Sequence, residues 1–177
     1  MVWYQSKKHN LWKLYRQDAV FCNEKQISGT VNNNGDGLNL VPATYYSAHS
    51  RLTATNKTAT LSCSSVVNRF SKTTNKKGNG KLLSPLALVT ADEVALAGGK
   101  LETENKDYYL RTNAYFCTMS PSHFNAGNAN AYVLCVKQTG LMDSSTYGLR
   151  AVINLKSNVL LSEGDGTIDN PYQIQMS

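Results

Sequence analysis

The sequence lacks the features that mark several large classes of protein. The 177-residue chain contains no apolar run of about 18 residues, so no membrane-spanning helix is expected. No charged, then apolar, then small-residue segment opens the chain, so no signal peptide is visible. No repeat with a period of about 20–50 residues is present, which argues against a solenoid or propeller. The length suits one domain with a hydrophobic core.

Motifs for common ligands and cofactors are also missing. The cysteines form no C-x-x-C pair, which argues against a zinc knuckle or a thioredoxin motif. Residues Gly78–Lys81 lack the spacing and the hydroxyl residue of a phosphate-binding loop. No recognition helix and no RNA-binding strand pattern appears. We therefore expect no cofactor and no nucleic-acid partner.

The sequence offers only weak candidates for a catalytic cysteine–histidine pair and for a calcium site. Cys117 and His123 are close in sequence and suggest a catalytic thiol–imidazole pair, but Pro121 and a strand end separate them. Residues 32–36 and 163–170 gather oxygen ligands, but neither matches the calcium-binding EF-hand pattern. Asp92 and Glu93 suit the first turn of a helix, where negative charge is favourable. The sequence thus predicts no enzyme site and no metal site.

The composition favours strands and turns. The chain contains 18 Asn, 16 Ser and 15 Thr residues, which is typical of strand- and turn-rich proteins. Its net charge of +6 is uneven, because residues 1–81 hold 12 Lys and Arg but only 3 Asp and Glu. Such a basic half suits nucleic acid or an acidic surface. A solvated face is the preferred interpretation, because the lysines follow no aromatic-lined groove.

Four cysteines, Cys22, Cys63, Cys117 and Cys135, indicate disulfides and an exported setting. Four cysteines allow three pairings, and the residues themselves leave the choice among them open.

Local patterns predict an α+β domain. Thr90 and Glu93 form a capping box that should begin a short helix over residues 90–97, which Gly98-Gly99 ends. Residues 29–40 are expected to be a turn or flexible loop, 48–70 short strands or irregular chain, and 75–81 a mobile basic loop. Strands are expected at residues 114–119, 131–137, 147–155 and 171–175, with a break at 120–122.

The segment between Asn113 and Tyr147 is rich in Tyr, Asn, Ser and His. Adaptable binding surfaces use such residues, because Tyr gives a large contact area at low entropic cost and Asn both donates and accepts hydrogen bonds. An ordinary Asn-rich loop region is the alternative interpretation.

Several motifs, in a fixed order, resemble those of a known family. They are Leu88–Gly99, Tyr109-Leu110, Phe116–Pro121, Tyr147–Ser157 and Gly164–Tyr172. Together they resemble exported bacterial surface proteins with a C-type-lectin-like fold of the formylglycine-generating-enzyme type. The resemblance extends to the variable proteins of diversity-generating retroelements. The resemblance covers residues 80–175 well and the earlier residues loosely. The chain departs from the family at two positions, where Cys117 replaces the usual Trp and Ala151 replaces the usual Pro.

The resemblance implies a single C-type-lectin-like domain over residues 1–177, with a less regular part at 1–80 and a core at 81–177. It implies a disulfide Cys22–Cys63, the family's N-terminal bridge, and the accompanying hypothesis is that Cys117 and Cys135 face each other on neighbouring strands and pair. Fold likeness alone does not carry over the enzyme's activity. The expected function is non-catalytic ligand binding or adhesion by a display domain of an exported surface protein, with a carbohydrate-binding lectin or a formylglycine-generating-type enzyme as alternatives.

In the variable proteins of diversity-generating retroelements, codons near the C-terminus are rewritten, and the resemblance implies that the corresponding segment here would be residues 113–146. The partner would be a protein or glycan on another cell or surface, with no direct membrane insertion. The setting would be extracellular, on a cell surface, a pilus or a phage particle. The expected ligand-binding residues, with Tyr115 and Tyr132 as anchors, are Asn113, Tyr115, Ser122, His123, Asn125, Asn128, Asn130, Tyr132, Lys137 and Asp143.

Overall fold

The computed structural model contains mostly strands and few, short helices, so the chain has the expected α+β character. It describes residues 16–35, 39–53, 57–63, 65–105, 107–108, 114–125, 130–137, 141–144, 147–165, 169–170 and 172–176. No helix within these residues has the length and apolar character needed to cross a membrane. The expected site residues Asn113 and Asn128 lie outside the described part.

One seven-stranded sheet organises the molecule. Its strand order is β3-β4-β8-β9-β10-β7, and β11 pairs with β8 beside this path. Neighbouring pairs are antiparallel except β10–β7 and β11–β8. The sheet strands are β3 (Ile27–Gly35), β4 (Asn39–Tyr46), β7 (Lys100–Leu101), β8 (Phe116–Asn125), β9 (Asn130–Val136), β10 (Leu141–Ser144) and β11 (Gly148–Leu149).

Eight short strands pair two by two outside this sheet. Each pair joins segments far apart in sequence except β14–β15, which forms a hairpin. They are β1 (Arg16–Gln17) with β13 (Asn154–Leu155), β2 (Phe21–Cys22) with β5 (Arg69–Phe70), β6 (Ala87–Leu88) with β12 (Ala151–Val152), and β14 (Val159–Glu163) with β15 (Gln173–Met176).

The prediction of a turn or flexible loop over residues 29–40 is wrong for the described residues 29–35 and 39–40. Most of that segment lies in the β3–β4 hairpin, whose register runs from Ile27 opposite Tyr46 to Gly35 opposite Asn39. The Asn- and Gly-rich composition suggested a loop, but β4 also contains β-favouring Val41, Thr44 and Tyr45. Pairing of β4 with β8 brings this hairpin into the main sheet. The N-terminal half is therefore continuous with the C-terminal half.

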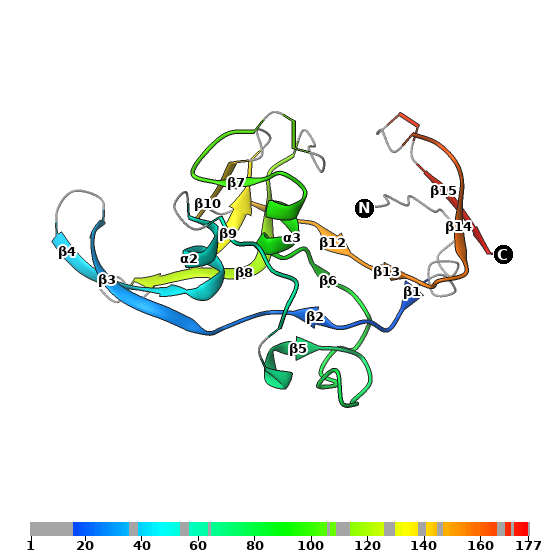
Figure 1. The fold of residues 1–177 in the computed structure, drawn as a ribbon, viewed down its shortest axis with the longest axis horizontal. Helices are drawn as coiled ribbons and strands as arrows, with labels where there is room; N and C mark the ends of the chain where they lie inside the picture. The colour runs from blue at the N-terminus through cyan, green and yellow to red at the C-terminus, as the bar shows by residue number, and fades with distance from the viewer. Residues whose placement is uncertain are drawn as a thin grey trace.

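Two helices pack on the sheet (Figure 1). Helix α3 (Ala91–Leu96) begins at Thr90 with both hydrogen bonds of the predicted capping box, and it ends just before Gly98, whose φ is +98°. Helix α2 (Ser47–Leu52) replaces part of the strands or irregular chain expected after residue 48. It buries Ala48 and Leu52, which are four residues apart and therefore share one helical face.

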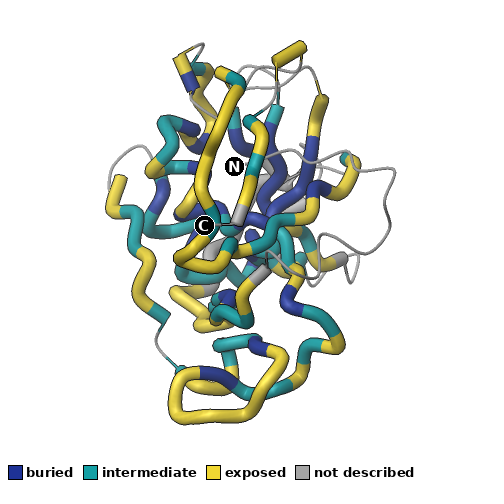
Figure 2. The backbone as a smooth tube through the Cα atoms, turned by 90° about the vertical axis from the view of Figure 1, so that its right-hand side faces the viewer, coloured by how far each residue is buried: buried dark blue, intermediate teal, exposed yellow. Residues whose placement is uncertain are grey.

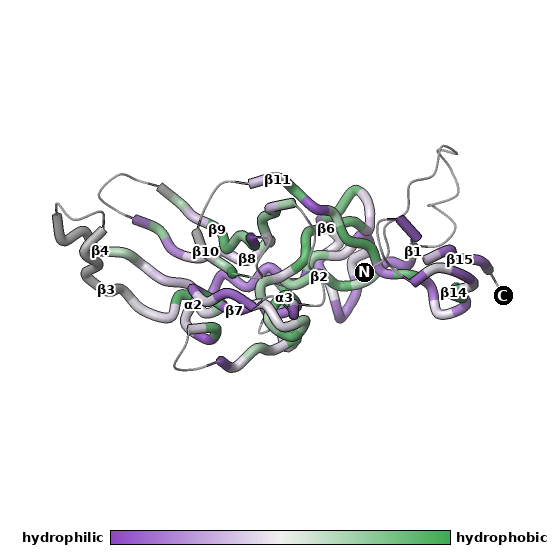
Figure 3. The backbone as a smooth tube through the Cα atoms, turned by 90° about the horizontal axis from the view of Figure 1, so that it is seen from above, coloured by the Kyte–Doolittle hydropathy of each residue, from purple (hydrophilic) through white to green (hydrophobic). Residues whose placement is uncertain are grey.

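The hydrophobic core lies between these helices and the sheet. Val89 and Val94 come from the α3 region, and Leu134, Val136 and Met142 from the middle of the sheet; all are at most 2% exposed. Figure 3 shows the apolar segments gathered around β6, β8, β9 and α3, whereas the end that carries β15 is polar. At about 25 cal/mol per Å² of buried apolar area, this layer is a main source of stability.

The break predicted at residues 120–122 is also wrong, because β8 continues through Pro121 to Asn125. Proline cannot donate a backbone hydrogen bond, and the β8–β9 register shifts on both sides of Pro121. Because of these shifts the strand has no regular series of hydrogen bonds at Pro121, so it tolerates the missing backbone N–H of proline.

The single strand expected at residues 147–155 is instead three two-residue strands with different partners. Arg150 separates the first two; its guanidinium is buried 4.1 Å from the centre of the Phe116 ring. Because this charged side chain turns inward, the side chains do not alternate regularly between the two faces of a single strand.

The loop at residues 75–81, expected to be mobile, is held by local hydrogen bonds. The Asn75 side-chain oxygen accepts from the backbone N–H groups of Lys77 and Gly78, and Thr74 forms a bridge with Asn79. The loop is therefore an ordered turn.

Both expected disulfides are present, Cys22–Cys63 and Cys117–Cys135. Cys22–Cys63 joins β2 to the segment before η1 (Val66–Asn68), and Cys117–Cys135 links directly opposite positions of β8 and β9. Disulfides are typical of proteins that fold in oxidising compartments.

Candidate functional site

Four aromatic rings form a continuous row on the sheet. His49 lies with its ring centre 4.4 Å from that of Tyr45, Tyr45 lies 5.3 Å from His123, and His123 stacks on Tyr132 at 4.5 Å. All four side chains are partly exposed. We call this group, His49, Tyr45, His123 and Tyr132, the ring row.

Strand register explains why these residues meet. Tyr45 of β4 lies opposite His123 of β8, and His123 lies opposite Tyr132 of β9. Side chains at opposite positions of adjacent strands share one face of a sheet, so the three rings stand side by side. Helix α2 starts directly after β4, which brings His49 back over Tyr45.

Both imidazoles of the ring row favour their neutral form. Burial, and secondly the charge of His123, lowers the pKa of His49 to about 4. Burial also lowers the pKa of His123. At neutral pH each ring thus offers one nitrogen donor and one nitrogen acceptor, as the tyrosine hydroxyls also do. The ring row is uncharged and able to hydrogen bond in both senses.

Ser122 holds the His123 ring in place. The Ser122 hydroxyl lies 3.0 Å from Nδ1 of His123, and the Ser122 residue is completely buried. We expected Ser122 to contact a ligand directly, but its burial prevents that in this structure. It orients the imidazole instead.

The other expected site residues do not all gather in one place. His123 and Tyr132 lie in the ring row, and Asn125 and Asn130 pair at the adjoining end of β8 and β9. Tyr115, by contrast, precedes the other end of β8 and stacks on Tyr147 at 4.8 Å. Phe116, the neighbour of Tyr115, lies opposite Val136, which is four residues from Tyr132 along β9. At about 3.3 Å per strand residue, the two expected anchors are therefore roughly 15 Å apart along the strands. The structure thus divides the expected surface in two.

Lys137 and Asp143 belong to the half nearer Tyr115. Lys137 directly follows β9 and donates its backbone N–H to Leu141, while Asp143 in β10 lies opposite Cys135.

Tyr45 and His49 were not among the expected ligand-binding residues. Their distance in sequence from residues 113–146 hid them, because only the pairing of β4 with β8 brings them beside His123. A weak signal existed in the Thr44-Tyr45-Tyr46 run, which has high strand propensity.

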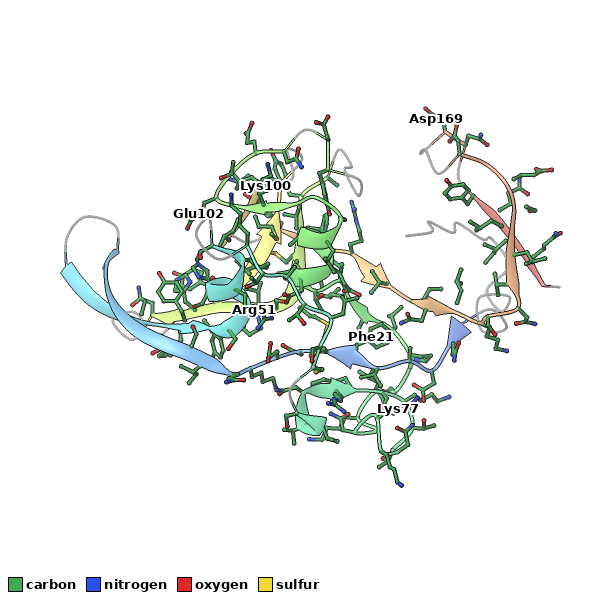
Figure 4. The ribbon with its side chains drawn as sticks, viewed as in Figure 1. Phe21, Arg51, Lys77, Lys100, Glu102 and Asp169 are labelled. Atoms are coloured by element: carbon green, nitrogen blue, oxygen red, sulfur yellow. A yellow bond between two sulfur atoms is a disulfide. The ribbon has the colours of Figure 1, made fainter. Side chains whose placement is uncertain are left out.

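A second feature is a polar cavity of about 230 Å³ beside the two helices, lined in part by Phe21, Glu24, Arg51, Asp92, Glu93 and Ser120. Arg51 donates to Glu24 over 2.7 Å and to Asp92 over 2.8 and 3.3 Å. Figure 4 shows Arg51 directed from the α2 region toward the middle of the molecule. The paired charges make this cavity a structural junction between the helices.

Among the described residues, no group of three or more His, Cys, Asp or Glu side chains is placed to hold a metal ion. Comparisons with protein families, with characterised proteins and with solved structures gave no match. The ring row is therefore the main structural basis for a functional proposal.

Protonation of His49 gives a testable pH dependence. Its pKa is about 4 in the folded protein and near 6.5 when unfolded, so only the unfolded chain binds this proton between those values. The free energy of unfolding should therefore fall as pH decreases from 6.5 to 4, by about 1–2 kcal/mol after allowance for partial exposure. Urea unfolding at several pH values measures this change.

The control is His49→Phe, which keeps a ring against Tyr45 but cannot be protonated. This variant should show a shallower loss of stability between pH 6.5 and 4 than the wild type. An identical pH profile for the two proteins would contradict the assignment to His49.

Proposed function

We propose that this chain is a non-catalytic ligand-binding domain of an exported surface protein, and that the ring row is its main contact site. The observation that carries the proposal is the gathering of four partly exposed rings from three strands and a helix. Tyrosine is enriched among the residues that dominate binding energy at interfaces. The ordered sheet beneath the rings reduces the entropy lost on binding.

The same proposal includes a C-type-lectin-like fold. The capped helix α3, the antiparallel β8–β9–β10 meander and the disulfide between β8 and β9 support it. A display or adhesion role outside the cell is supported by the two disulfides. Residues 113–146 are the proposed diversified segment, which would vary His123 and Tyr132 while Tyr45 and His49 stay constant.

Two alternative functions, an enzyme and a carbohydrate-binding lectin, have different support. A formylglycine-generating-type enzyme would need a reactive thiol, whereas all four cysteines are bonded in disulfides. Carbohydrate is the second candidate ligand. Sugar hydroxyls both donate and accept hydrogen bonds, as do the neutral imidazoles and phenols of the ring row.

The test begins with a printed glycan array and a displayed random-peptide library, both probed with the disulfide-intact protein. The binder selected by either screen is then titrated against the wild type, Tyr132→Ala and Tyr115→Ala. Tyr132→Ala should weaken binding roughly thirtyfold, which is the size of an interface hot spot. Tyr115→Ala should change the affinity less than threefold, because it belongs to the other ring pair.

Tyr115→Ala is a matched control, since it removes the same side chain from the same sheet. Thermal unfolding of both variants checks that they remain folded. A larger loss for Tyr115→Ala would move the site to the opposite end of β8. The absence of any specific binder in both screens would contradict the proposed function.

A further inference from the structure

A second surface is set apart by its charge. Residues 57–83, which we call the basic lobe, contain Lys57, Arg69, Lys72, Lys76, Lys77 and Lys81 but no Asp or Glu. It starts beside helix α2, where Thr58 donates its backbone N–H to Arg51, and in Figure 1 its part around η1 and β5 projects below the sheet. Figure 2 shows its lower part as mostly exposed chain. The excess of positive charge in the N-terminal half is thus partly concentrated in one projection.

The charges of the basic lobe are directed to solvent. All five of its lysines are exposed. The two ion pairs found among the described residues both belong to Arg51, outside the lobe. Asp18, outside the lobe, accepts the backbone N–H groups of Lys72 and Thr73 with its carboxylate and partly offsets the charge of Lys72. The lobe therefore keeps a clear excess of positive charge.

The lobe presents these lysines on a fixed backbone. Leu82 donates its backbone N–H to Ser71, Asn79 donates to Arg69, and the Asn75 side chain caps the turn. A side chain in place of Gly78 would overlap Ser71, since an added Cβ would collide with the Ser71 hydroxyl oxygen. The lysine-bearing loop is therefore packed closely, and ordering it costs little further entropy on binding.

Exposed aliphatic side chains accompany the lysines. Val66 and Val67 of η1 are 48% and 66% exposed, and Leu83 is 96% exposed. Single exposed apolar residues are common, but three in one basic projection combine the two features that interfacial membrane binding uses. Aliphatic groups enter the headgroup region while lysines meet anionic lipids.

The same surface is less suited to nucleic acid. Its one arginine, Arg69, donates to the backbone oxygen of Cys63 through two nitrogens, so its guanidinium is engaged within the lobe. Its one aromatic ring, Phe70, is partly buried and has the Lys25 ammonium 5.6 Å from its centre. Single-stranded nucleic acid is typically bound by stacking platforms beside a basic groove.

We propose that the basic lobe binds peripherally to the surface of an anionic lipid bilayer, through its lysine headgroup contacts and its exposed aliphatic side chains. The ring row and the basic lobe lie on separate elements, so this binding is independent of the proposed ligand site. Anchoring by the lobe would hold the domain at a membrane surface without crossing it.

Vesicle cosedimentation tests the proposal with the full chain and two kinds of vesicle, phosphatidylcholine alone and phosphatidylcholine mixed with phosphatidylglycerol. The wild type should bind only the mixed vesicles, and more weakly as salt is raised. The variant K76Q/K77Q should bind roughly ten- to thirtyfold more weakly, because each lysine near such a surface adds appreciably to the affinity.

The control is K100Q/K156Q, which removes the same charge from exposed lysines outside the lobe. Figure 4 shows Lys77 and Lys100 on opposite sides of the molecule. This variant should lose less than threefold. Equal losses for the two variants, or equal wild-type binding to both kinds of vesicle, would overturn the proposal.

A second variant, V66S/V67S, separates a lipid surface from a soluble polyanion. It should weaken vesicle binding severalfold but leave binding to heparin or duplex DNA unchanged, since those ligands gain nothing from aliphatic contacts. If V66S/V67S had no effect on vesicles while duplex DNA competed with them fully, the lobe would be a general polyanion site and the lipid assignment would be wrong. Thermal unfolding checks the fold of each variant.

Discussion

Replacing both Cys22 and Cys63 with alanine is expected to lower the free energy of unfolding by about 4 kcal/mol. The disulfide closes a segment with a sequence separation of 41 residues, so its loss greatly increases the conformational freedom of the unfolded chain. Both cysteines are only partly buried, so alanine should leave little empty space at either position. Urea unfolding of the wild type and the double variant measures the difference.

The comparison is Cys117→Ala/Cys135→Ala. That disulfide spans 18 residues, for which chain entropy alone accounts for about 3 kcal/mol. Both of its cysteines are buried, so their replacement also removes packing contacts. A loss below about 1 kcal/mol for the Cys22 and Cys63 variant would show that this disulfide does not constrain the unfolded chain as expected.

Arg51→Met should cost about 2–4 kcal/mol of folding free energy. The Arg51 side chain is 22% exposed, whereas those of its partners Glu24 and Asp92 are 12% and 8% exposed. Burial acts to lower the pKa of Arg51, but hydrogen bonds and charge attraction from Asp92 and Glu24 outweigh burial and leave the pKa raised. Removing the guanidinium leaves two nearly buried carboxylates without their cation, which is strongly destabilising.

Chemical denaturation at pH 7 measures this loss, and two further variants test its cause. Arg51→Lys keeps the positive charge but cannot form the two-pronged contact with Asp92, so its loss should be intermediate. Arg51→Met/Asp92→Asn should recover part of the loss, because it removes one unpaired charge. If the double variant were less stable than Arg51→Met, unpaired charge would not be the cause.

Local features were read correctly where neighbouring residues decide the structure. The start of α3 followed from Thr90 and Glu93, which are within one helical turn and satisfy each other's backbone N–H groups. The strand over residues 131–137 was likewise found within one residue, as β9, from its run of apolar, β-favouring residues. Such patterns depend on short-range contacts that the sequence displays directly.

Features that depend on distant partners were misread. The Asn-rich segment around residues 32–34 looks like a loop by composition, yet it pairs in register with β4. Pro121 looks like a strand break, but shifts in the β8–β9 register accommodate it. In both places the contribution of long-range pairing exceeds the local preference, which for strands is small and dependent on context.

The candidate site shows the same division. His123 and Tyr132 were found from the types of residue in their segment, whereas Tyr45 and His49 became visible only through the alignment of β4 beside β8. Ser122 was expected to contact a ligand, but its side chain is buried and orients His123. Whether a polar residue contacts solvent or supports a neighbour is decided by burial, which depends on packing.

The sequence by itself determined the α+β class, the capped helix and the segment that carries half of the ring row, because these depend on residues close together in the chain. The tertiary structure alone decided that β3 and β4 join the main sheet and that Tyr115 and Tyr132 stand apart. It also decided that exposed lysines and exposed aliphatic side chains lie together on the ordered backbone of the basic lobe. These outcomes depend on strand register and chain closure, which balance contacts between distant segments against conformational entropy.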